Sequence, residues 1–173
     1  MSTLIYKKER TFKYPCDKVA KILMDTEESS YDMSELENVT KWKSIKEINE
    51  PDRRIGTKEW CAHGQIPKAL QHILSPRMLT WLEHSEWNRK TNTYSFRIET
   101  FYMKNIVSCS GRTIFKASGT DKCIRDFYID LKVNIPVLGP LVEGLVIDFL
   151  KKNEEQDFNL SARALEKALG KKP

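Results

Sequence analysis

The feature that most constrains this chain is a long helical pattern that directly follows an alternating strand and a Pro-Gly corner. The corner reads Ile-Pro-Val-Leu-Gly-Pro at residues 135–140. After it, apolar residues recur at intervals of three, four or seven over residues 140–168, the spacing of one face of an α-helix. At about 1.5 Å per residue, such a helix is about 43 Å long. This arrangement favours a sheet wrapped around one long helix, with an apolar space between them.

The segment before the corner predicts a strand with one apolar face. Over residues 123–135, Phe127, Ile129 and Leu131 alternate with polar residues, so one face points to a core and the other to water. Turn-forming residues separate further strand patterns at hairpin spacing, which favours an antiparallel sheet. These patterns cover residues 3–12, 43–50, 55–63, 69–75, 78–87, 93–103 and 106–117.

Two short helices are expected after the first strand. The first covers residues 15–25, where Pro15 suits the first helical position and Asp17 suits the positive end of the helix. The second covers roughly residues 27–37 and has a weaker apolar stripe. In the long helix, polar residues interrupt the apolar stripe near its middle: Asn153, Gln156 and Asp157. They mark either a cavity floor with polar needs or the edge of the helix, and we favour the edge.

Composition places the chain among ordinary globular proteins. Its 173 residues suit one domain, and we expect a single domain over residues 1–173. The formal charge is +5, but basic and acidic residues are interleaved, which is typical of a solvated surface. No signal-peptide pattern or membrane-spanning run is recognisable, and the four cysteines are widely scattered. We therefore expect reduced thiols and a cytoplasmic location.

The order of predicted elements is that of the helix-grip fold, and the chain resembles the START-like superfamily (SRPBCC) of polyketide cyclases/dehydrases and lipid-transport proteins. Residues 12–25, Phe-Lys-Tyr-Pro-Cys-Asp-Lys-Val-Ala-Lys-Ile-Leu-Met-Asp, resemble its strand-to-helix opening. Residues 135–143 are similar to the strand-to-helix junction of an uncharacterised bacterial branch. The resemblance implies an α+β fold, in which a curved antiparallel sheet wraps around a long C-terminal helix. It also implies an apolar pocket for lipids, sterols or polyketides, but no single reaction.

No motif assigns a catalytic residue, a metal ligand or a cofactor. Cys61, His63, His72 and His84 lack the spacing of known metal sites, and no nucleophile elbow or phosphate loop occurs. Acidic pairs such as Glu83 with Glu86 and Asp126 with Asp130 are expected on the outer, solvated faces of strands. Aromatic and basic residues do interleave between positions 81 and 104, but glutamates interrupt them. Burial in a curved sheet explains these aromatics, so we expect no nucleic-acid partner.

We interpret the chain as a protein that binds or transports a small hydrophobic ligand, such as a lipid, sterol or polyketide-like molecule. Two alternatives stay open: a cyclase- or hydrolase-type enzyme that uses His72, His84 or Tyr128 as acid or base, and a protein-interaction module with a filled core. We expect a monomer or a weak dimer, and the sequence allows transient membrane contact. The expected ligand-binding residues are Phe96, Ile98, Phe115, Phe127, Ile129, Leu131 and Val133 on the sheet, with Val142, Leu145, Val146 and Phe149 on the long helix.

Overall fold

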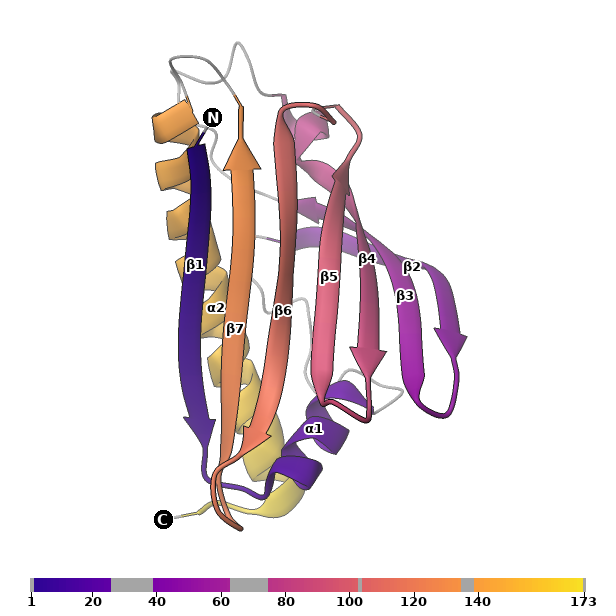
Figure 1. The fold of residues 1–173 in the computed structure, drawn as a ribbon, viewed down its shortest axis with the longest axis vertical. Coiled ribbons are helices and arrows are strands. Elements are labelled where there is room, and N and C mark those ends of the chain that lie inside the picture. The colour runs from indigo at the N-terminus through magenta and orange to yellow at the C-terminus, as the bar shows by residue number, and fades with distance from the viewer. Residues whose placement is uncertain (1, 26–38, 63–74, 103, 135–138, 173) are drawn as a thin grey trace.

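In the described part of the chain, seven strands form one open antiparallel sheet that a long helix crosses (Figure 1). The structure is a computed structural model and describes residues 2–25, 39–62, 75–102, 104–134 and 139–172. The strand order is β1-β7-β6-β5-β4-β3-β2, so β1 and β2 are the edges. The elements are β1 (Ser2–Phe12), α1 (Cys16–Met24), β2 (Val39–Asn49), β3 (Arg53–Ala62), the 3-10 helix η3 (Pro76–Leu79), β4 (Thr80–Asn88), β5 (Thr93–Thr100), β6 (Val107–Ala117), β7 (Cys123–Val133) and α2 (Gly139–Leu169).

This architecture confirms the predicted α+β helix-grip fold. The long helix extends one residue further at each end than predicted, and Gly170 ends it with a φ of 83° that suits glycine. Pro15 precedes α1 as its N-cap and is not its first helical residue. The second short helix predicted over residues 27–37, the strand predicted over residues 69–75 and residues 135–138 of the corner lie outside the described residues.

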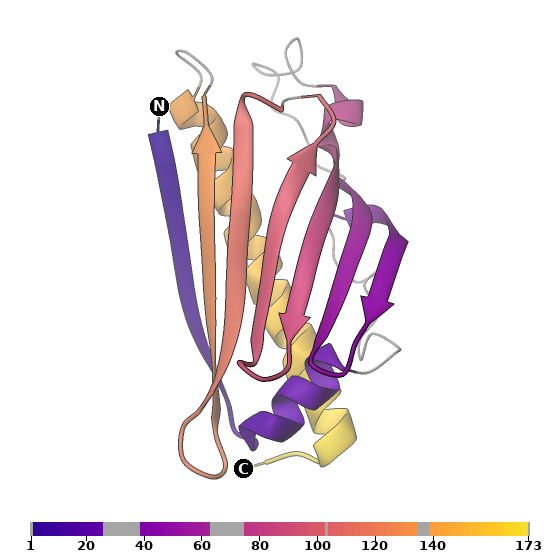
Figure 2. The same ribbon diagram turned by 45° about the vertical axis from the view of Figure 1, so that its right-hand side comes forward.

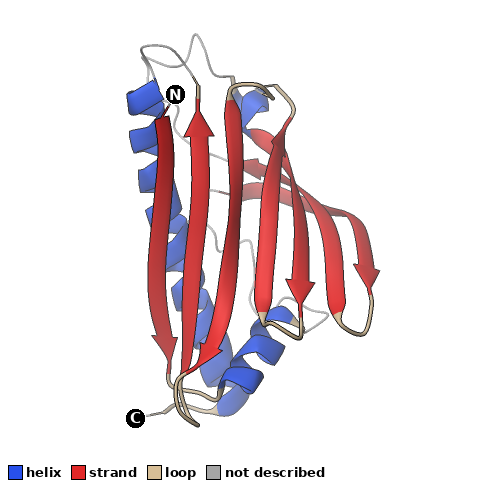
Figure 3. Ribbon diagram, in the orientation of Figure 1, coloured by secondary structure: helices blue, strands red, loops and turns tan. Residues whose placement is uncertain are grey.

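Helices and strands lie in two layers, and the sheet bends toward the helical layer (Figures 2 and 3). α2 runs diagonally behind the sheet and meets α1 near the C-terminal end of the chain. We call the face of the sheet that is turned toward α2 the inner face, and the opposite one the outer face. Cross-strand pairing fixes which side chains share the inner face, and one row across it consists of Leu4, Leu131, Cys109, Ile98, Glu83 and Lys58.

Two apolar clusters fill different parts of the interface between the sheet and the helices. The lower cluster in Figure 1 joins α1 to the C-terminal half of α2, and the upper cluster joins β7 to the N-terminal half of α2. Among the described residues, no helix is both long and apolar enough to cross a lipid bilayer. The buried members of the lower cluster are Phe12, Tyr14, Cys16, Val19, Ala20, Trp87, Phe115, Cys123 and Leu165, and those of the upper cluster are Ile129, Leu131, Val133 and Val142.

Gly111 on β6 allows the ring of Phe96 to lie directly against the backbone of the sheet. A Cβ atom at Gly111 would lie 2.5 Å from Cζ of Phe96 and 2.6 Å from the carbonyl oxygen of Tyr128. We predict that Gly111→Ala lowers the free energy of unfolding by about 1–3 kcal/mol, because the ring or the backbone must move. Urea denaturation measures this change, and wild-type stability in Gly111→Ala would contradict the prediction.

Gly144 in α2 provides the control for this substitution. No atom outside its immediate surroundings lies within 4 Å of a Cβ built there, and the residue is exposed. Since alanine favours a helix over glycine, Gly144→Ala should raise the free energy of unfolding by about 0.5–1 kcal/mol. The two glycine substitutions are therefore expected to change stability in opposite directions.

Candidate functional site

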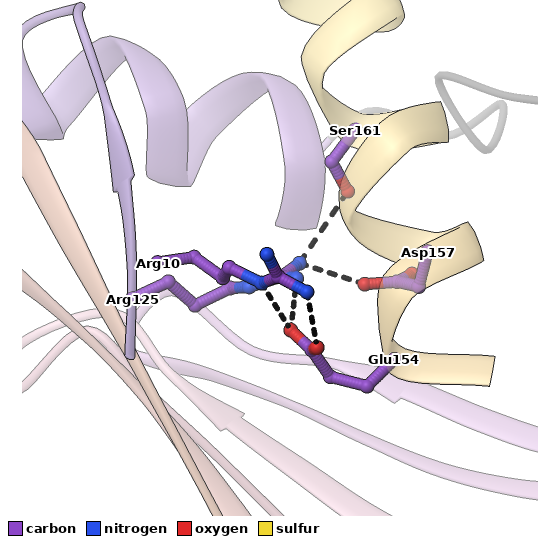
Figure 4. A network of polar contacts seen from close by, with 5 residues as sticks. All are labelled: Arg10, Arg125, Glu154, Asp157 and Ser161. Atoms are coloured by element: carbon purple, nitrogen blue, oxygen red, sulfur yellow. Dashed lines mark hydrogen bonds and ion pairs between the residues drawn. The ribbon is translucent and has the colours of Figure 1, made fainter. Parts of the chain in front are cut away.

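A buried polar network joins β1 and β7 to the middle of α2 (Figure 4). Arg10 Nε and Nη2 donate hydrogen bonds to the two carboxylate oxygens of Glu154, at 3.2 and 2.9 Å. Arg125 Nη1 donates to Asp157 Oδ2 at 2.7 Å and to Ser161 Oγ at 3.4 Å, and its Nη2 lies 3.4 Å from Glu154 Oε1. Arg125 and Glu154 are each only 6% exposed. Two cations and two anions therefore neutralise one another inside the protein.

Along β1, β7 and α2, this network lies between the two apolar clusters. The guanidinium of Arg125 lies 5.5 Å from the ring centroid of Phe12 in the lower cluster, and its strand neighbour on the other side, Phe127, packs with the upper cluster. The hydrogen bonds to Glu154 raise the pKa of Arg10, which keeps the pair ionised. The network therefore forms a charged but neutralised floor below the upper cluster.

The sequence analysis did not predict this network, although the sequence contains two signals for it. Arg125 occupies the inward phase of β7, between Cys123 and Phe127. Of the two interpretations of the polar residues in the middle of α2, the less favoured one, a floor with polar needs, fits Asp157, which accepts a hydrogen bond from the buried Arg125. An arginine on the apolar face of a strand, combined with acids that interrupt an apolar helix stripe, indicates a buried ion pair.

Apart from the buried Trp87, the inner-face residues of β4 and β5 are only half-buried, although both strands lie in the middle of the sheet. On β7, Ile129, Leu131 and Val133 are each 2% exposed. On β5, by contrast, the inner residues Phe96 and Ile98 are only half-buried. The main contacts of α2 with the sheet are to β1 and β7, which explains why the helix does not seal the inner face of the central strands.

Most of the predicted ligand-binding residues meet in the upper cluster. Phe115 does not, because it lies opposite Arg125 and packs in the lower cluster with its ring centroid 6.0 Å from that of Trp87. Ile98 lies on the inner face beside Glu83 but is outside both clusters, and so is Phe149, which is half-buried on α2. The predicted residues that the upper cluster brings together are Phe96, Phe127, Ile129, Leu131, Val133, Val142, Leu145 and Val146.

A second polar group lies on the inner face of β4 and β5. Tyr94 Oη donates a hydrogen bond of 2.6 Å to Glu83 Oε1. Burial raises the pKa of Glu83, and burial together with the neighbouring Glu83 carboxyl raises the pKa of Tyr94 well above its ordinary value. The expectation that Glu83 lies on the outer face with Glu86 was wrong. Residues three apart on a strand face opposite sides, and Glu86 is the one that faces outward, 3.7 Å from Arg53.

His84 and Tyr128, two of the acid–base candidates named for an enzyme, lie on the outer face. His84 Nε2 is 2.8 Å from Glu99 Oε2, and its Nδ1 is 3.2 Å from Thr57 Oγ1. The ring of Tyr128 lies beneath two outer-face cations, of Lys7 and Arg112. His72, the third candidate, is outside the described residues. Within the described ranges, no three His, Cys, Asp or Glu side chains gather so that they could hold a metal ion.

Comparison with known proteins places this geometry in a broad structural class. The model of a family described as "Protein of unknown function (DUF2505)" matches residues 7–163. No curated protein matches the chain. The structure of TTHA0849 from Thermus thermophilus superposes with a TM-score of 0.68 at 19% identity, and the match covers 96% of this chain and 99% of that one.

Two further solved structures share the fold. The Zhui aromatase/cyclase from Streptomyces sp. R1128 gives a TM-score of 0.62 at 13% identity, over 96% of each chain. A START superfamily protein from Mycobacterium smegmatis gives 0.54 at 12% identity, over 94% of this chain and 97% of that one. These likenesses confirm the START-like fold that the sequence resembles, and at such identities they establish the fold alone.

Proposed function

The chain belongs to the DUF2505 family of proteins of unknown function, and we propose that it binds or carries a small hydrophobic molecule between the inner face of the sheet and α2. The observation that carries this proposal is the accessible surface on the inner face of β4 and β5. These strands have neighbours on both sides and curve toward α2, yet Glu83, Phe96 and Ile98 remain half-buried. Apolar surface in such a position gains about 25 cal/mol for each Å² that a ligand covers.

Electrostatics support an enclosed space at this position. Desolvation raises the pKa of Glu83 and Tyr94, and it raises the pKa of Cys109 to about 12. All three residues are nevertheless only half-buried. Such a residue is surrounded by protein and shielded from bulk water, but part of its surface is not covered by other atoms. This combination is expected where a protein encloses a space large enough for a small molecule.

The two ends of this space differ in character. Toward the lower cluster, the neutralised network of Arg10, Arg125, Glu154 and Asp157 resists penetration by an apolar ligand, because those groups would lose their hydrogen bonds. Around the upper cluster, the walls are aliphatic and aromatic. The apolar part of the ligand is therefore placed against the upper cluster, with its far end above the network.

We predict that Ile98→Trp weakens the binding of an apolar probe at least tenfold, because a larger ring fills the space beside Glu83 and Phe96. Arg97→Trp is the matched control, since Arg97 is the adjacent residue of β5 and is exposed on the outer face. Displacement of 1-anilinonaphthalene-8-sulfonate by a panel of lipids and sterols measures binding, and circular dichroism checks folding. Native mass spectrometry of the wild-type protein provides a test that needs no variant. Absence of probe binding, of displacement and of any co-purifying ligand would contradict the proposed function.

A further inference from the structure

Glu83 differs from Glu154 and Asp157 in having no cation within salt-bridge distance among the described residues. Glu154 and Asp157 each lie within 3.4 Å of an arginine nitrogen. Among the described residues, no Lys, Arg or His nitrogen lies within 4.0 Å of the Glu83 carboxyl, and its one hydrogen bond comes from Tyr94. A desolvated carboxylate without a cation is unfavourable, so Glu83 is placed where an added positive charge would be stabilising.

The surroundings of Glu83 suit a cation that is attached to an apolar body. The ring centroids of Tyr94 and Phe96 lie 6.2 Å apart on the neighbouring strand. Trp81 is the next inner residue of β4, and it lies opposite Trp60 of β3, whose Nε1 is buried and has no hydrogen-bond partner. Aromatic faces attract cations, most strongly where water is excluded. The inner face therefore combines aromatic walls with a carboxyl that no cation of the described residues neutralises.

We propose that Glu83 anchors the amine group of the ligand, so that the ligand class is a hydrophobic amine with a cationic nitrogen on an apolar or aromatic body. This inference rests on the proposed function. The ammonium group donates to Oε2 of Glu83, while Tyr94 continues to donate to Oε1. The apolar body then lies against Phe96 and the upper cluster.

The charged and titratable groups around Glu83 are compatible with this assignment. Lys58 lies opposite Glu83 on β3, but its Nζ lies over the Trp42 ring at 5.7 Å from the centroid. Tyr94 from β5 and Cys109 from β6 have raised pKa values and stay neutral at physiological pH. Among the described residues, the charge of Lys58 opposes the rise in the pKa of Glu83 and that of Arg54 opposes the rise in the pKa of Tyr94, but neither cation lies within salt-bridge distance of the Glu83 carboxyl.

Proton linkage provides a signature of this site. An ammonium ion pairs with the ionised form of Glu83, whereas burial raises the pKa of Glu83 and favours its neutral form. Amine binding therefore releases a proton from Glu83 when the pH is below that pKa. Affinity for the amine is expected to rise with pH through the pKa of Glu83 and then to level off, until the amine itself loses its proton.

Three matched probes test the proposal: 1-naphthylmethylamine, 1-naphthalenemethanol and 1-naphthaleneacetate. Isothermal titration calorimetry of the wild-type protein should show the amine binding at least tenfold more tightly than the alcohol. Glu83→Gln, which keeps the shape of the side chain, should weaken amine binding about 10- to 100-fold and change alcohol binding far less. Glu86→Gln is the control, because Glu86 is on the outer face of the same strand, and it should change neither affinity.

Each outcome separates this inference from the proposed function. If the amine and the alcohol bind equally, or if the acetate binds most tightly, the amine assignment is overturned and hydrophobic binding stands. If none of the three probes binds and no dye is displaced, the proposed function itself fails. Loss of amine preference in Glu83→Gln without loss of alcohol binding also shows that the variant is folded.

Stability against pH gives a second readout for Glu83. Because the pKa of Glu83 is raised in the folded protein, the folded state binds more protons, and the free energy of unfolding falls as the pH rises from the unfolded to the folded pKa. Glu83→Gln should lack this fall and be at least as stable as the wild type at neutral pH. A variant that is less stable there would assign Glu83 a structural role and overturn the proposal.

Discussion

Glu154→Met is expected to lower the free energy of unfolding by about 3–5 kcal/mol, because it leaves two positive charges without one of their two counter-ions. The side chain of Arg125 is only 7% exposed and would keep Asp157 as its remaining anion. Arg10 is 22% exposed and can turn toward water. The cost therefore arises mainly from the buried Arg125, which cannot be hydrated without opening the interface between β7 and α2.

Urea denaturation at neutral pH measures this effect, with Glu50→Met as the control. Glu50 pairs with Arg53 at 2.6 Å, but both side chains are more than two-fifths exposed, so that loss should stay within about 1 kcal/mol. The double variant Arg125→Met/Glu154→Met removes one charge of each sign. It should be more stable than Glu154→Met alone. A Glu154→Met protein no less stable than the Glu50→Met control would show that the network does not hold α2 against the sheet.

Local patterns predicted the elements of this fold because the relevant signals lie close together in sequence. Alternation over β7 and three-four spacing over α2 each need only a dozen residues to be recognised, and the structure bears out both. On β4, Thr-Trp-Leu-Glu-His-Ser-Glu-Trp-Asn, the prediction that Glu83 faces outward was wrong. Apolar and polar residues occur among both the odd-numbered and the even-numbered positions, so alternation does not show which side chains face inward. The buried Trp87 fixes the phase, and it places Glu83 on the inner face with Trp81.

Local sequence patterns did not predict which residues far apart in the sequence contact one another. Arg10 and Glu154 are 144 positions apart, and Tyr94 meets Glu83 across a hairpin whose register the sequence does not specify. The candidate site consists of an apolar wall, which periodicity predicted, and of polar groups, which it did not. The polar groups depend on the register of the sheet and on the angle at which α2 crosses it.

Trp87→Ala should cost about 3–5 kcal/mol of unfolding free energy, because Trp87 is 1% exposed and fills the centre of the lower cluster. Its ring centroid lies 6.0 Å from that of Phe115, and its Nε1 donates to Asp25 Oδ1 at 3.1 Å, which ties β4 to the end of α1. Thermal and urea denaturation measure the loss. Trp42→Ala is the control, because Trp42 is 45% exposed and its loss should cost less than about 1 kcal/mol.

Substitutions in the two clusters are expected to have different effects: those in the lower cluster mainly on stability, and those in the upper cluster mainly on ligand affinity. Trp87 belongs to the lower cluster and not to the upper one, so the folded fraction of Trp87→Ala should bind the naphthalene alcohol with nearly wild-type affinity. Phe96 is half-buried in the upper cluster, so Phe96→Ala should lose less stability than Trp87→Ala but bind the alcohol several-fold more weakly. Equal losses of affinity in the two variants would mean that the network does not separate them. Opposite rankings for stability and affinity would identify the lower cluster as the core and the upper cluster as the binding wall.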